Sequence, residues 1–196
     1  MMGNNNRPKP GSQIKVEPIR RQEDINRIKA LLTNHPRNLA LFTLGINTNL
    51  RASDLIRITT GQITEIGPGE SFELREKKTS KIRRITLNNG THAVIQKWIG
   101  VGCLRQRDPI FRSQRGGRLT VAAVNHLVKG WCREIGLAGN YGSHTLRKTW
   151  GYHAWRAGID LPRLMVIFNH SSQRQTLDYL CIQAEEIKDV YMSVEL

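Results

Sequence analysis

The sequence predicts an α+β fold that is mainly α-helical and contains one small three-stranded antiparallel sheet. Apolar residues recur at helical spacing before residue 58 and again after residue 91, and the segment between them alternates as β-strands do. The 196 residues are enough for one full hydrophobic core. With 39% hydrophobic and 23% charged residues, the composition is that of an ordinary globular protein.

The first third of the chain predicts an arm followed by helices. Residues 1–18 are rich in Asn, Pro and Lys and lack periodicity, which indicates a flexible basic arm. Four apolar residues share one face of a helix expected over 20–33, and a His-Pro pair ends it. The apolar stretch 39–46 predicts a buried helix. Ser53 is a suitable N-cap for a short helix over 54–58.

A β pattern follows these helices. Strands are expected over 62–66, 71–75 and 81–87, which together form the predicted three-stranded sheet. The first two strands flank a Gly-Pro-Gly turn at 67–69, and the third follows a polar turn at 77–80.

The chain then returns to helix. The elements expected, in order, are helices over 91–100, over 121–136 with Thr120 as N-cap, over 144–157 with Ser143 as N-cap, over 161–168, and from Gln173 onward. Gly158 is expected to end the third of these helices. Residues 108–118 are basic and rich in Gly, which indicates a loop.

The charge balance indicates the class of partner. Lys and Arg number 30 against 16 Asp and Glu, so the formal net charge is +14 and a polyanionic partner is expected. This charge is spread through folded segments rather than gathered in one tail, which favours nucleic acid over a membrane surface. The N-terminus lacks the apolar segment of a secretory signal, and no apolar run is long enough to span a membrane. We therefore expect a cytoplasmic, nucleoid-associated protein.

Five residues form a candidate site for breaking a phosphodiester bond without metal: Arg51, His144, Arg147, His170 and Tyr179. The arginines could bind a phosphate, and the histidines could transfer protons near neutral pH. The tyrosine hydroxyl could attack the phosphorus. His144 and Arg147 lie three residues apart on one predicted helix and therefore share a face. Each residue alone has an ordinary structural explanation, so the prediction depends on their combination.

These residues and their surroundings resemble the tyrosine recombinases, also called phage-type integrases. The resemblance rests on segment 44–55 around the first arginine, on His144-Thr-Leu-Arg147, and on segment 169–179, in matching order and spacing. It assigns 19–196 to one catalytic domain and implies the catalytic-domain fold of that family.

The resemblance implies a role for each of the five residues. Tyr179 would be the nucleophile, while Arg51, Arg147 and His170 would hold the scissile phosphate. His144 would be the general base or a proton relay. The product would be a 3′-phosphotyrosyl enzyme and a free 5′-hydroxyl, so site-specific recombination would need no ATP, metal or other cofactor.

The family also places a lysine in a β-hairpin between the first arginine and the His-x-x-Arg motif, where it would protonate the departing 5′ oxygen. Lys78 is the best match, with Lys77 and Lys81 as neighbouring alternatives. Asp54 lies three residues after Arg51, where the family has an acidic residue, and would position Arg51 or Lys78.

The implied partner is double-stranded DNA, bound by a homo-oligomer that is expected to be a tetramer. Residues 181–196 are either a helix on their own core or a tail exchanged between protomers. We expect no N-terminal core-binding domain, as in a short natural protein or a fragment. Two alternative functions stay open: a non-catalytic DNA-binding regulator with this fold, and DNA relaxation of the type IB topoisomerase kind.

Overall fold

Helices are the main secondary structure of the computed structural model, which describes residues 15–182 and residue 192. The elements in chain order are α1 (Gln22–Leu31), α2 (Pro36–Thr48), α3 (Ala52–Leu55), the 3-10 helix η1 (Thr60–Gln62), β1 (Ser71–Arg75), β2 (Ile82–Thr86), α4 (Asn89–Val101), α5 (Val121–Glu134), α6 (Ser143–Arg156), α7 (Leu161–Phe168) and α8 (Gln173–Leu180). The mainly helical α+β fold class is confirmed. Within the described part of the chain, none of the helices is both long and apolar enough to cross a membrane.

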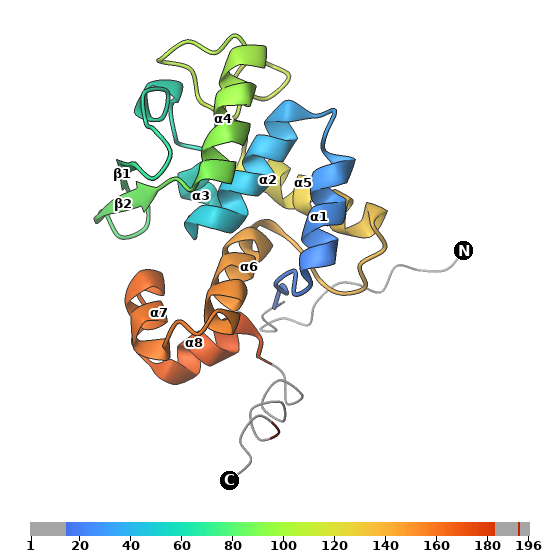
Figure 1. Ribbon diagram of the computed structural model, residues 1–196, viewed down its shortest axis with the longest axis vertical. Helices are drawn as coiled ribbons and strands as arrows, with labels where there is room; N and C mark the ends of the chain where they lie inside the picture. The colour runs from blue at the N-terminus through green and yellow to red at the C-terminus, as the bar shows by residue number, and fades with distance from the viewer. Residues whose placement is uncertain (1–14, 183–191, 193–196) are drawn as a thin grey trace.

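The apolar residues form a large cluster and a small one. The large cluster surrounds α2, whose residues 40–46 are all buried, as the apolar run in the sequence predicts. The small cluster is formed by Leu164, Phe168 and Leu180 of the last two helices. Helix α6 contributes Leu146 to the first cluster and packs Trp150 against the second. Figure 1 shows α6 between α1–α5 on one side and α7 and α8 on the other.

Helix α6 approaches α7 and α8 closely at Gly151. A Cβ at this position would lie 2.7 Å from Cδ2 of Leu180 and against the ring of Phe168. Glycine therefore lets the backbone of α6 contact the small cluster directly.

Gly151→Ala is expected to lower the free energy of unfolding by about 1–3 kcal/mol, because the added methyl group overpacks this contact. Gly130→Ala in α5 is the matched control, since a Cβ there meets no heavy atom within 4 Å. The control should raise stability by up to about 1 kcal/mol through its higher helix propensity. Urea unfolding measures both, and equal effects would contradict the close approach at Gly151.

Within the described residues, the predicted three-stranded sheet has two strands. Strands β1 and β2 pair antiparallel with Phe72 opposite Ile85. The predicted strand over 62–66 is instead the end of η1 and a turn, so that prediction was wrong. Its apolar residues, Ile63 and Ile66, are three apart, which suits a helical turn better than a strand.

The backbone of this segment also bonds elsewhere. The N–H of Thr60 donates to the carbonyl of Asp108 at 2.9 Å, and the N–H of Gly61 donates to Gln106 at 2.8 Å. These donors face the loop before α5, so they are not available to a sheet partner.

Several helix ends agree with the sequence and two differ. Thr120 caps α5 through its side chain as predicted, and Gly158 follows α6 with a φ of +85°. Ser53 and Ser143 were wrongly predicted as N-caps. Each lies inside its helix, because α3 begins at Ala52 and α6 begins at Ser143 itself.

The segment that leads into α1 is described from Lys15 onward, and it packs against the rest of the described structure. Ile19 is buried, and its N–H donates to Oγ1 of Thr149 in α6 at 2.9 Å. Predictions for the arm at 1–14 and for the tail at 183–191 and 193–196 fall outside the described residues.

Candidate active site

The five residues singled out from the sequence come from four separate elements. Arg51 is the residue before α3, in extended conformation. His144 and Arg147 lie in the first two turns of α6. His170 lies between α7 and α8, and Tyr179 lies in the last turn of α8.

Tyr179 is surrounded by three side chains. The centroid of its ring lies 5.1 Å from that of Phe168 and 5.1 Å from that of His170, which it meets edge-on. The ammonium group of Lys148 lies 4.8 Å from the ring centroid, within range of a cation–π interaction.

Burial raises the pKa of the Tyr179 hydroxyl above its usual value, and the nearby charges of Arg147 and Arg51 partly oppose this rise. The hydroxyl is therefore protonated near neutral pH. A group that accepts its proton is needed before it can act as a nucleophile.

Arg147 is a buried cation that is only partly hydrogen-bonded. Arg147 is 3% exposed, and its Nη2 donates to the carbonyl of Phe168 at 3.1 Å. Its Nε is buried and has no hydrogen-bond partner among the described residues. Burial lowers the pKa of this guanidinium to about 10, so it is charged at neutral pH. A buried cation with an unused donor favours an anionic ligand.

Arg51 is held by two carboxylates. Its Nη1 lies 2.9 Å from Oε2 of Glu76 and 4.0 Å from Oδ2 of Asp54. Asp54 is buried, and its Oδ1 accepts the N–H of Lys77 at 2.8 Å. Asp54 thus connects α3 to the turn between β1 and β2.

Glu76 is a site residue that the sequence analysis missed. Besides Arg51, its carboxylate contacts Nη1 of Arg83 at 3.3 Å and accepts the hydroxyl of Thr79 at 2.7 Å. The available signal was that Glu76 is the only acidic residue in the basic stretch 75–84.

Both histidines are neutral at neutral pH. The pKa of His170 is lowered by burial and then by the charges of Arg147 and Arg51. The pKa of His144 is also lowered, first by partial desolvation of its ring and then by the charges of Arg147, Lys148, Arg51 and Lys78. The residue as a whole is exposed, so its ring can meet a ligand from solvent.

His170 is also fixed in orientation. Its ring stacks on Phe168 at 5.2 Å between centroids, and its Nδ1 lies 3.1 Å from the hydroxyl of Thr176. Its Nε2 is then the nitrogen that remains for another partner.

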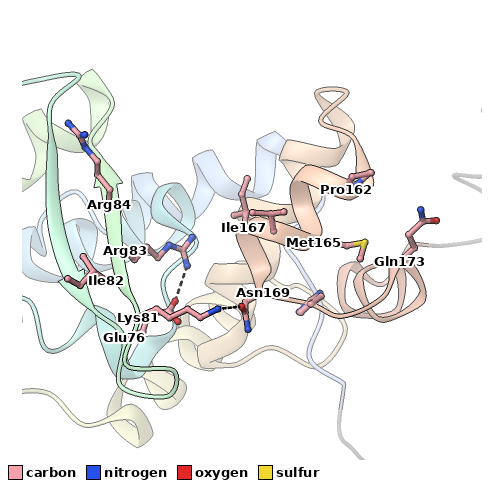
Figure 2. Close-up of a pocket in the computed structure, with 12 residues that line it drawn as sticks. Glu76, Lys81, Ile82, Arg83, Arg84, Pro162, Met165, Ile167, Asn169 and Gln173 are labelled. Carbon is pink, nitrogen blue, oxygen red and sulfur yellow. Dashed lines mark hydrogen bonds and ion pairs between the residues drawn. The ribbon is translucent and has the colours of Figure 1, made fainter.

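The three candidate lysines have different surroundings. Lys78 is exposed in the β1–β2 turn, and its charge reaches His144. Lys81 donates instead to Oδ1 of Asn169 at 3.1 Å, across the groove drawn in Figure 2. Lys77 contributes its backbone N–H to Asp54. Of these three lysines, Lys78 is the one whose charge lowers the pKa of His144.

The site residues therefore lie close enough for their charges to act on one another. Arginine and lysine side chains outnumber carboxylates in the site. Among the described residues, no three His, Cys, Asp or Glu side chains are grouped as metal ligands. What this arrangement favours is a bound anion next to a tyrosine hydroxyl.

Comparison with known proteins identifies the family. The model of the phage integrase family matches residues 20–186. The chain belongs to the phage integrase family. Its relatives include the probable integrase/recombinase YoeC of Bacillus subtilis, which is 30% identical over 178 residues, covering 90% of this chain and 95% of YoeC. The tyrosine recombinase XerD of Oceanobacillus iheyensis is 26% identical over 193 residues, covering 94% of this chain and 64% of XerD.

Solved structures of recombinases share the fold. The XerA recombinase superposes with a TM-score of 0.75 at 17% identity, over 95% of this chain and 66% of XerA. The XerH recombinase in a post-cleavage complex with its difH substrate gives 0.72 at 18% identity, over 87% of this chain and 51% of XerH. The phage integrase fold of the chain is thereby confirmed. The chain spans between 43% and 64% of the XerC and XerD relatives.

Proposed function

We propose that this phage integrase family member is a site-specific DNA recombinase that cleaves and rejoins DNA strands through a 3′-phosphotyrosyl link at Tyr179. One observation carries the proposal. The buried guanidinium of Arg147, with an unused Nε, and the ring of Tyr179 both lie against Phe168, each 5.1 Å from the centroid of its ring. A phosphate bound by Arg147 would therefore lie close to a nucleophile.

The scissile phosphate is proposed to bind between Arg51, Arg147 and His170. Each arginine offers a planar pair of donors that fits two phosphate oxygens, and Nε2 of His170 adds a further donor when Nδ1 accepts from the hydroxyl of Thr176. Such fixed donors favour the pentacovalent transition state, in which negative charge on the oxygens increases.

Two proton transfers complete the proposed cleavage. The phenol oxygen of Tyr179 attacks phosphorus and gives its proton to neutral His144, directly or through water. The bond from phosphorus to the 5′ oxygen breaks, and Lys78 supplies a proton to that oxygen. Asp54 positions the lysine-bearing turn through the N–H of Lys77. Attack of another strand's 5′-hydroxyl reverses both transfers and rejoins the DNA, without ATP or metal.

The rate of cleavage should not change between about pH 8 and pH 6.5 and should fall at lower pH. The pKa of His144 is lowered from its usual value of 6.5, so the ring stays neutral until the pH is below that value. Single-turnover rates of adduct formation across this range measure the profile. A rate that increases as the pH falls below 6.5 would contradict a neutral base.

Covalent capture tests the function without knowledge of the target site. The protein is incubated with duplex DNA that carries a randomised segment and a nick, and denaturant-stable adducts are collected and sequenced. A recombinase should yield adducts enriched in one sequence. Adducts without enrichment would favour topoisomerase-like relaxation, and DNA binding without adducts would indicate a regulator.

The proposed partner is double-stranded DNA of the nucleoid in the cytoplasm, which the net charge of +14 favours. The proposed active assembly is a tetramer on DNA, formed by a catalytic domain over 19–196. Exchange of residues 181–196 between protomers stays a prediction, because most of that tail lies outside the described residues. Sedimentation of the captured complex tests the number of protomers.

A further inference from the structure

Glu76 lies at the centre of a buried polar network between α3 and the β1–β2 hairpin. Its residue is 8% exposed, and both carboxylate oxygens are used. Oε2 accepts from Nη1 of Arg51 at 2.9 Å and from the hydroxyl of Thr79 at 2.7 Å, while Oε1 accepts from Nη1 of Arg83 at 3.3 Å. Figure 2 shows the Glu76 and Arg83 side chains meeting beside the turn that connects β1 and β2.

The contact with Glu76 uses only part of the Arg51 guanidinium. Glu76 and Asp54 both contact Nη1. Within residues 15–182 and 192, Nε and Nη2 of Arg51 donate to no protein group, and together they form the edge that can fork onto two phosphate oxygens. Glu76 therefore orients Arg51 without occupying the edge that DNA would need.

The same carboxylate oxygen also fixes the turn that carries Lys78. Thr79 is the next residue after Lys78, and its hydroxyl donates to Glu76 Oε2. The backbone closes the turn as well, because the N–H of Ser80 donates to the carbonyl of Glu76 at 3.0 Å. One oxygen atom thus links a phosphate-binding arginine to the neighbour of the proposed proton donor.

We propose that Glu76 is a positioning residue that couples Arg51 to Lys78. It holds the phosphate-binding arginine and the proton donor of the leaving group in fixed positions relative to each other. This inference rests on the proposed recombinase function. Glu76 acts through these two side chains and does not touch DNA. Of the contacts that Glu76 makes, the one with Thr79 affects the position of Lys78 and not that of Arg51.

Thr79→Val and Thr79→Ser form a matched pair for the test. Valine keeps the shape of threonine and removes the hydroxyl, whereas serine keeps the hydroxyl. Both are assayed by single-turnover adduct formation on a duplex recovered by covalent capture, synthesised in two versions. One version has the natural 5′ oxygen at the scissile phosphate, and the other has sulfur at that bridging position. A thiolate is a good leaving group and needs no proton donor.

On the oxygen DNA, Thr79→Val is expected to react about 10–100-fold more slowly than the wild type, as a small displacement of a catalytic group costs. On the sulfur DNA it should react within about 3-fold of the wild type, because the step that needs Lys78 is bypassed. Thr79→Ser should match the wild type on both. An equal loss on both DNAs, or no loss on oxygen DNA, would overturn the coupling.

Glu76→Gln provides the second arm. It should slow adduct formation on both DNAs, since Arg51 also loses its ion-pair partner. The loss of rate should be larger on the oxygen DNA. Faster cleavage by Glu76→Gln would instead identify Glu76 as a competitor of the DNA phosphate and overturn the proposal. If wild-type protein forms no adduct on either DNA, the proposed function itself fails. If the wild type reacts but the variants do not follow this pattern, only the role of Glu76 fails.

Discussion

Replacing Tyr179 with phenylalanine is expected to abolish the covalent protein–DNA adduct while leaving DNA affinity within about twofold of the wild type. The substitution removes one oxygen atom and no part of the ring. The contacts of the ring with Phe168, His170 and Lys148 can therefore persist. No hydroxyl is left to attack phosphorus, so the proposed chemistry has no nucleophile.

The measurements are denaturing gel electrophoresis for the adduct and gel-shift titration for binding. Tyr152→Phe is the control, since it makes the same chemical change on α6, where the ring packs against Trp155 and beneath Arg20. It should retain adduct formation. An adduct that persists in Tyr179→Phe would refute the assignment and direct attention to another tyrosine.

The helices were predictable because their signals are local. The apolar run of α2, the cap at Thr120 and the stop at Gly158 each depend on residues a few positions apart. The failed strand over 62–66 depended on distant partners. Thr60 and Gly61 donate to a loop more than forty residues later in the chain, and nothing near them in the sequence signals this.

The residues of the candidate site also differ in whether the sequence signals them. The five residues and Lys78 were singled out because their order and spacing resemble a family, although the elements that carry them are far apart in the sequence. Glu76 was missed because its role exists only after the hairpin folds back. It then lies against Arg51, which precedes it by 25 residues. A lone carboxylate in a basic stretch is a weak signal, since it has no spacing relative to the motifs.

Replacing Arg147 with lysine is expected to slow adduct formation by about 10²–10³-fold at saturating DNA, and alanine should cost at least as much. Loss of one fixed donor to a developing negative charge has an effect of this size. Lysine keeps the charge but not the planar pair of donors, so it cannot hold two phosphate oxygens and the carbonyl of Phe168 together.

Stability and catalysis can be separated in these variants. The carbonyl of Phe168 loses a buried donor in Arg147→Ala, which should lower the free energy of unfolding by roughly 1–3 kcal/mol. Lysine should lower it less. Adduct rates measured well below the unfolding temperature then report the phosphate contact, not folding. Arg133→Lys, at an exposed position in the last turn of α5, is the control and should change neither quantity. If Arg147→Lys forms adducts at the wild-type rate, the buried guanidinium serves packing and does not bind the scissile phosphate.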